Sequence, residues 1–248
     1  MTRIAALLLI LAASPAWAGP PFLTDDPEPP ELGRFEINTA AIGTFVKDGR
    51  QGSLPFIDIN YGAGADLQLH LGLQNGFAGQ GGRTRFGYGD TELGVKYRFL
   101  EEDEAGWQPQ IALYPNLEIP TGSTTKQLGT GEKRLFLPIW LQKSIGDWTS
   151  FGGGGYWINP SDGPLIQRNY WFAGWAVLRK LDDDLQLGGE IFWQSANDGA
   201  ALTGAGFNLG GEYDLDDTHH ILFSAGRGLE DPSRYNAFSC YLGLQLIL

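Results

Sequence analysis

Histidines and carboxylates are the side chains of this sequence that could do chemistry, and the histidines are few. The chain of 248 residues contains His70, His219 and His220 and a single cysteine, Cys240. Nucleophilic catalysis needs a serine or an equivalent group beside a base that a third group orients. His70 stands in the middle of an expected strand without a recognisable serine motif. We therefore assign no catalytic residue.

His219 and His220 follow Asp216 and Asp217 in an expected turn. Imidazole and carboxylate groups bind divalent ions, but this spacing matches no known ligand pattern. We therefore expect no metal and no other cofactor. Because Cys240 is the single cysteine of the sequence, an internal disulfide is excluded, and we interpret Cys240 as a small strand residue.

Side-chain character alternates along residues 89–120, on both sides of a turn. The polar set is Asp90, Glu92, Lys96, Arg98, Gln110 and Glu118. The apolar set between them includes Leu93, Val95, Leu113 and Leu117. A period of two puts successive side chains on opposite faces of a strand. No helix or second layer is visible to cover the apolar face, so we expect that face to contact lipid.

About twelve segments of strand length follow one another from residue 34 to residue 248. Short, often acidic turns, such as 101–104, 182–184 and 216–217, alternate with mostly longer Gly-rich loops, such as 47–53, 79–85 and 121–133. Outer-membrane barrels have short periplasmic turns, longer external loops and an even number of strands. The sequence predicts an all-β protein: a closed antiparallel transmembrane β-barrel of about twelve strands in the outer membrane of a Gram-negative cell.

In these strands every second residue tends to be polar, and these polar residues are predicted to line the lumen. The candidates are Asp58, Asn60, His70, Asp90, Glu92, Lys96, Arg98, Gln110, Glu118, Glu190 and Glu212. An aromatic girdle is expected from residues near strand ends, namely Trp148, Tyr156, Trp157, Trp171, Trp175 and Tyr213. The facing of residues 148–158, with glycines at 152–155, stays unassigned. Pro109, Pro115 and Pro138 fall inside expected strands, where proline removes a ladder hydrogen bond, so we expect bulges or shifted boundaries there.

The N-terminal 18 residues have the pattern of a cleaved signal peptide. Arg3 precedes an apolar run of about ten residues, and Ala16-Trp17-Ala18 forms a small-x-small cleavage site. Residues 19–33 follow as a Pro-rich segment without sheet pattern. It is either a short plug or a periplasmic tether, and we expect the tether.

Charge limits the partners of the protein. The formal net charge is −12, which disfavours nucleic acid, because binding it needs clustered Lys and Arg. The expected partners are outer-membrane lipid, the barrel assembly machinery and a small-molecule solute.

Outer-membrane barrels usually end in an aromatic residue, whereas this chain ends in Leu248.

Two short motifs resemble a known family. The segment Gly19-Pro20-Pro21-Phe22-Leu23-Thr24-Asp25-Asp26-Pro27, with Gly33-Arg34-Phe35-Glu36 after it, is similar to the opening of the outer-membrane family named for a MetA pathway of phenol degradation. Leu117-Glu118-Ile119-Pro120-Thr121-Gly122, then Leu128-Gly129-Thr130-Gly131, is similar to the core of that family. The resemblance implies a porin-like or transporter-like barrel linked with uptake of aromatic or hydrophobic compounds.

The loop at residues 121–133 is the candidate gate. Its glycines allow it to fold into the lumen, with Thr121, Gly122, Gly129 and Gly131 as the gate candidates, although a solvated loop tip is the commoner outcome. A barrel of about twelve strands has a narrow lumen. Excess acid on the inner face would favour cations and neutral solutes over anions, while Lys96 and Arg98 could equally form structural ion pairs.

We therefore expect an outer-membrane channel for small solutes and not an enzyme. The alternatives are a non-transporting structural or surface-interaction barrel and, less favoured, an enzyme built on a barrel.

Overall fold

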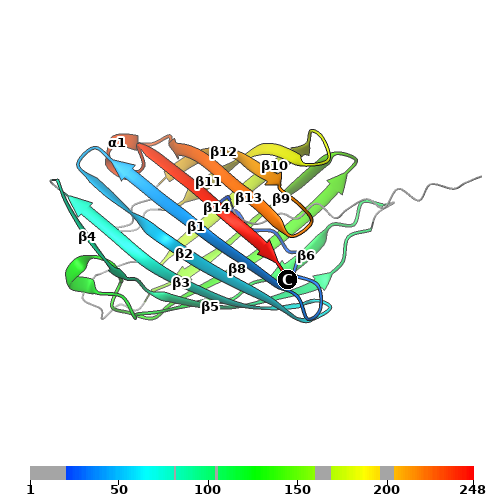
Figure 1. Cartoon of the computed structure of the whole chain (residues 1–248), viewed down its shortest axis with the longest axis horizontal. Helices are drawn as coiled ribbons and strands as arrows, with labels where there is room; N and C mark the ends of the chain where they lie inside the picture. Colours follow the sequence, from blue (N-terminus) through cyan, green and yellow to red (C-terminus); the bar gives the residue numbers. More distant parts are fainter. Residues whose placement is uncertain (1–20, 81, 104–105, 160–168, 196–203) are drawn as a thin grey trace, which may run out of the picture.

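The strands of the protein form one antiparallel sheet whose first and last strands pair, so that the sheet closes into a barrel (Figure 1). The computed structural model describes residues 21–80, 82–103, 106–159, 169–195 and 204–248. The expected signal peptide, residues 1–18, lies outside them.

The barrel wall consists of fourteen strand segments. They are β1 (Phe35–Val46), β2 (Gly49–Gly64), β3 (Leu67–Gln80), β4 (Arg83–Tyr88), β5 (Thr91–Leu100), β6 (Gln110–Leu113), β7 (Asn116–Ile119), β8 (Arg134–Ile145), β9 (Trp148–Ile158), β10 (Tyr170–Lys180), β11 (Leu185–Gln194), β12 (Gly204–Asp214), β13 (His219–Gly228) and β14 (Phe238–Ile247). The described residues also form the 3-10 helix η1 (Thr124–Lys126) and the short helix α1 (Pro232–Tyr235). None of the described helices is long and apolar enough to cross a membrane.

Two spanning strands are interrupted, so fourteen segments make twelve strands. β4 and β5 both pair with β3, one after the other. β6 and β7 both pair with β5 on one side and with β8 on the other. The prediction of a closed barrel of about twelve strands is confirmed.

Of the bulges or shifted boundaries expected at the prolines, the structure mostly shows shifted boundaries, at Pro109 and Pro115. The break between β6 and β7 falls at Tyr114 and Pro115, yet the register with β8 is the same on both sides of it. Pro138 stays inside β8 opposite this break, and its carbonyl accepts the backbone N–H of Tyr114 at 3.2 Å. The carbonyl of Pro115 accepts the backbone N–H of Val95 in β5 at 3.1 Å, so the missing donors of the two prolines face different neighbouring strands. Pro109 lies just outside β6.

A true bulge separates β4 from β5. Tyr88 pairs with Asn75, whereas Glu92 pairs with Gly72, so one strand holds an extra residue. An extra residue inverts the alternation of faces. Even-numbered residues point outward before the bulge, as exposed Phe86 and Tyr88 show, and inward after it.

The outer face of the barrel is apolar and the inner face is polar. Large exposed apolar side chains on the outer face include Leu69, Leu93, Val95, Leu113, Ile139, Ile191, Leu209, Leu242 and Leu244. Buried polar side chains are correspondingly numerous, as described below. This distribution is the reverse of that in a water-soluble protein, and it suits a closed barrel surrounded by lipid. The chain is thus a transmembrane barrel of the outer membrane.

Turns and loops alternate as predicted, with three corrections. The expected loops 47–53 and 79–85 are shorter than expected, because β2 begins at Gly49, β3 ends at Gln80 and β4 begins at Arg83. The expected acidic turn at 101–104 lengthens to residues 101–109. The two expected loops 159–168 and 195–205 lie largely outside the described residues.

Apolar side chains also pack inside the barrel. Trp140, Phe172, Phe192 and Tyr114 form one buried cluster, and Phe136 and Trp157 pack against it. The expected girdle is therefore wrong for Trp157, whose ring stacks on Phe136 at 4.8 Å between centroids. The neighbouring Tyr156 instead contacts the exposed Trp171.

Glycines in β9 explain why its alternation is hard to recognise in the sequence. A Cβ at Gly152 would meet Trp175, which is exposed on the outer face, and a Cβ at Gly153 would meet the buried Trp140 at 3.1 Å. The glycines thus make room for one tryptophan on each face. Because Phe151 is fully buried, the odd-numbered residues of β9 face the inside of the barrel.

Candidate functional site

The interior of the barrel holds all eleven candidate lumen residues. Eight are buried: Asp58, Asn60, His70, Asp90, Lys96, Gln110, Glu190 and Glu212. Glu92, Arg98 and Glu118 are also on the inner side, with side chains that are 30, 17 and 14 % exposed. They do not form one continuous lining. The structure divides them among separate clusters, and several clusters bind segments inserted into the lumen.

The N-terminal segment is the first inserted segment: residues 21–30 are mostly buried inside the barrel, whereas residues 31–33 are exposed. Glu190 of β11 accepts the backbone N–H groups of Leu23 and Thr24, both at 2.9 Å, and the Thr24 hydroxyl at 2.6 Å. Ser224 of β13 donates to the carbonyl of Pro21 at 2.7 Å. Thr24 is fully buried. The expected periplasmic tether is therefore wrong: this segment is a plug, held by contacts too remote in sequence to be recognised from it.

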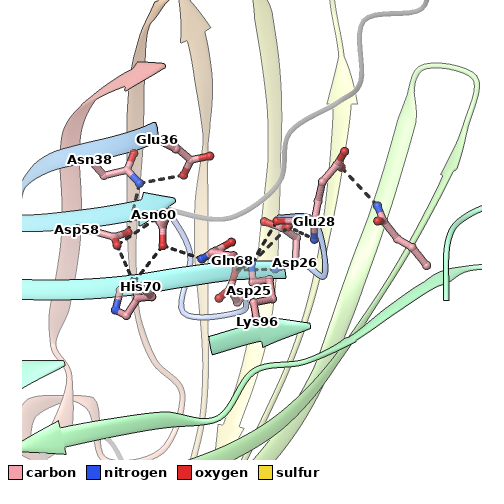
Figure 2. A network of polar contacts seen from close by, with 11 residues as sticks. Asp25, Asp26, Glu28, Glu36, Asn38, Asp58, Asn60, Gln68, His70 and Lys96 are labelled. Carbon is pink, nitrogen blue, oxygen red and sulfur yellow. Dashed lines mark hydrogen bonds and ion pairs between the residues drawn. The ribbon is translucent and has the colours of Figure 1, made fainter. Parts of the chain in front are cut away.

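Charged groups hold the middle of the plug (Figure 2). Lys96 Nζ lies 3.2 Å from Asp25 Oδ1 and 3.7 Å from Asp26 Oδ1. Gln110 donates to Glu28 at 3.4 Å. Burial raises the pKa of Asp26 despite the opposing charge of Lys96. Because Lys96 is itself buried in the wall, the plug carboxylates compensate a charge that would otherwise be unpaired.

A second network lies beside the plug on β1, β2 and β3 (Figure 2). Asp58 accepts from Asn38 at 3.2 Å and from Asn60 at 3.1 Å. Its Oδ1 lies 2.9 Å from Nδ1 of His70. On the inner face, Asn38 of β1 opposes Asp58 of β2, and Asn60 of β2 opposes His70 of β3.

A cavity of about 230 Å³ lies between the plug and this network. Carboxyl groups dominate the charged side chains of its wall. They are Asp25, Asp26, Glu28, Glu36, Asp58, Glu92 and Glu212. Lys96 and His70 are the basic side chains of the wall, which also includes Phe56 and Tyr114.

The candidate gate, the loop at 121–133, is the second inserted segment. Asp90 accepts the backbone N–H of Gly122 at 2.9 Å and the backbone N–H of Thr130 at 2.7 Å. The Thr121 hydroxyl donates to the carbonyl of Gly89 at 2.9 Å. Gly129 packs against Asp90, where a Cβ would overlap with the carboxylate. The loop is therefore attached to the β4–β5 bulge.

The three other candidates are Gly131, in the same loop, and Glu118 and Arg98, in the wall. Gly131 allows a left-handed turn, with φ of 79°. Glu118 lies 3.7 Å from Arg134, and Arg98 lies 2.9 Å from Asp66. Arg98 therefore forms a structural ion pair, as one interpretation of the sequence expected, while Lys96 binds the plug.

The histidines near the β12–β13 turn pair with carboxylates. His219 Nδ1 lies 2.9 Å from Asp216 Oδ1, in the turn. His220 Nδ1 lies 2.6 Å from Asp214 and 3.3 Å from Glu212. Glu212, Asp214 and His220 bring three potential ligand atoms within 4.8 Å of one another. The short distances between these groups are those of hydrogen bonds between imidazole and carboxyl groups.

A closed twelve-stranded barrel with a plugged polar lumen defines the class as an outer-membrane barrel. The chain belongs to the family described as "Putative MetA-pathway of phenol degradation", whose model matches residues 30–242. None of the curated proteins matches this sequence.

Solved outer-membrane proteins share the fold. The COG4313 outer membrane channel from Pseudomonas putida F1 superposes with a TM-score of 0.70 at 15% identity, covering 90% of this chain and 98% of that chain. The KdgM porin, solved with disordered oligogalacturonate, has a TM-score of 0.57 at 12% identity over 85% of this chain and 98% of its own. The NanC porin has a TM-score of 0.53 at 9% identity over 86% of this chain and 98% of its own.

Proposed function

We propose that this protein is a passive outer-membrane channel for small solutes, narrowed by its own N-terminal segment. The observation that carries the proposal is the plug itself. Residues 21–30 lie in the lumen through hydrogen bonds and ion pairs with Glu190, Ser224 and Lys96, and an internal cavity remains beside them. Noncovalent contacts of this kind can open without unfolding of the barrel.

Two features support small aromatic or hydrophobic solutes. The inner face carries a stack of rings, in which Trp157 lies between Phe136 and Tyr170 with centroids 4.8 and 5.9 Å away. The family description also refers to phenol degradation. The excess of carboxylates around the cavity favours neutral and cationic molecules over anions.

Conductance and solute flux test the proposal. The purified barrel in planar bilayers should conduct ions weakly, and a variant that lacks residues 22–30 should conduct several times more. Proteoliposomes should release small neutral aromatic solutes. A barrel that shows heat-modifiable gel mobility, and is thus folded, but passes neither ions nor solutes with or without the plug would refute the channel.

The alternatives make different predictions. A non-transporting barrel should bind partners through its loops and show no flux after deletion of the plug.

We also propose that the barrel is not an enzyme. The support is that each imidazole pairs with a carboxylate, His70 with Asp58, His219 with Asp216 and His220 with Asp214, and that no serine or threonine is hydrogen-bonded to an imidazole within the described residues.

A further inference from the structure

His70 presents to the cavity beside the plug a buried nitrogen, Nε2, that has no hydrogen-bond partner among the described residues. The residue is 8% exposed, it lines the cavity, and its Nε2 makes no hydrogen bond within the described part of the chain. A buried polar atom without a partner is costly, so such an atom in a cavity wall indicates a missing ligand or water.

The neighbours of Nδ1 place one proton of His70 on that nitrogen. Nδ1 lies 2.9 Å from Asp58 Oδ1 and 3.0 Å from Asn60 Oδ1. Asn60 donates its own amide group to Asp58, so its oxygen is the atom turned toward His70. Because both neighbours are acceptors, Nδ1 carries a proton. In the neutral ring Nε2 then holds a lone pair directed away from Asp58.

Glu92 faces the same nitrogen from β5. Its Oε2 lies 3.8 Å from His70 Nε2, which is too far for a direct hydrogen bond. Two acceptors at this separation can share one donor group placed between them. A primary ammonium has three N–H donors and a positive charge, and therefore satisfies a carboxylate and a lone pair together.

The remaining wall suits a small organic cation. The cavity of about 230 Å³ is several times the roughly 30 Å³ that one water molecule occupies in the liquid. Seven carboxyl side chains line it, and its single lysine is already paired with Asp25 and Asp26. Phe56 and Tyr114 add aromatic surface, which attracts cations and contacts apolar groups.

We propose that this cavity binds a primary ammonium carried on a small apolar or aromatic body, with Glu92 and His70 Nε2 as its acceptors. The inference deepens the proposed function, because the ligand would be a solute inside the channel. A doubly protonated His70 that contacts Glu92 through water is the competing explanation, and it predicts no preference for a cation.

Nitrogen NMR of the histidine rings provides a direct test. The chain has three histidines, so a ¹⁵N-histidine sample of the folded barrel gives few signals, and His70→Asn identifies those of His70. The probes are 2-phenylethylammonium and its neutral and anionic counterparts, 2-phenylethanol and phenylacetate. We expect the ammonium to shift the His70 Nε2 signal saturably and at least about tenfold more tightly than either counterpart.

Glu92→Gln separates a charge-specific site from general partitioning into the barrel. This isosteric variant should weaken ammonium binding about tenfold or more, since a charge-assisted hydrogen bond becomes a neutral one. Glu101→Gln, in the exposed turn after β5, is the matched control and should bind as the unmodified protein does. Equal binding of the three probes, or unchanged binding by Glu92→Gln, would overturn the inference.

Flux measured on the same preparations distinguishes this inference from the proposed function. A barrel that passes neutral aromatic solutes but does not prefer the ammonium refutes the binding site and leaves the channel intact. A barrel that binds the ammonium through Glu92 but passes no solute supports the site and refutes the channel.

Discussion

The backbone N–H of Gly122 donates a hydrogen bond of 2.9 Å to Oδ1 of Asp90, which joins the loop between β7 and β8 to the bulge between β4 and β5. Thr130 donates its N–H and its hydroxyl to the other oxygen of the same carboxylate, at 2.7 and 3.0 Å. One buried side chain thus holds both ends of the loop. The plug occupies the lumen independently, through Glu190 and Lys96.

Asp90→Ala should release this loop. Three charge-assisted hydrogen bonds are lost, each of the kind that contributes about 1.5 to 3 kcal/mol when one partner is charged. We expect trypsin to cleave after Lys126 at least several times faster than in the unmodified barrel. Asp48→Ala, in the exposed turn between β1 and β2, is the control. Unchanged cleavage after Lys126 would contradict the role of Asp90.

Gly129→Ala should reproduce this effect without removing Asp90. A Cβ at this position would overlap with the Asp90 carboxylate, so the loop must move away from the bulge. We expect the same increase in trypsin cleavage, with folding monitored by heat-modifiable mobility. Thr125→Ala changes an exposed side chain of the same loop and should leave cleavage unaffected. If trypsin does not cleave the loop of Gly129→Ala faster than that of the unmodified barrel, the added methyl group is accommodated without moving the loop.

Strand boundaries and faces were predictable where local pattern determines them. The segment expected at residues 148–158 is β9, and β11 begins directly after the acidic turn expected at residues 182–184, since such a turn cannot continue the alternation. Most of the residues that face the lumen could be predicted from the alternation of polar and apolar side chains alone. The parity inversion before Thr91 was missed, because a one-residue bulge changes the facing of Phe86 and Tyr88 without any change in composition.

The plug could not be recognised from the sequence. Its contacts join Thr24 to Glu190 and Pro21 to Ser224, residues 166 and 203 positions apart. The segment has no alternation, and five of the eleven residues from 20 to 30 are proline, a pattern equally typical of a solvated tether. One signal was available in retrospect: a buried lysine, Lys96, on an inner face needs a carboxylate partner.

Gly174→Ala should displace the plug while keeping the barrel. Gly174 lies on the inner face of β10, and a Cβ there would overlap with the Thr24 hydroxyl. We expect a larger single-channel conductance in planar bilayers, approaching that of the barrel without residues 22–30. Ala173→Gly, on the outer face of the same strand, is the control. An unchanged conductance would mean that the plug shifts without opening the lumen.

Protonation of Asp216 should loosen the turn between β12 and β13. The pKa of this exposed carboxyl is lowered, first by its hydrogen bond with His219 and then by the backbone N–H of Thr218. A depressed pKa means that the turn is stabilised above the ordinary pKa and loses this contribution as the pH falls through the lowered value. Amide NMR signals of Thr218 and His219 should therefore move together at acidic pH. Their movement should disappear in Asp216→Asn.

A charge on the outer face should destabilise the barrel according to its depth. Leu209 is 64% exposed near the middle of β12, whereas Leu215 is 52% exposed just beyond the end of that strand. Arginine costs about 2 to 4 kcal/mol at the bilayer midplane and about 0 to 1 kcal/mol near the interface. Reversible unfolding by denaturant in lipid vesicles should accordingly show a large loss of unfolding free energy for Leu209→Arg and a small one for Leu215→Arg. Equal losses at the two positions would contradict the placement of β12 across the membrane.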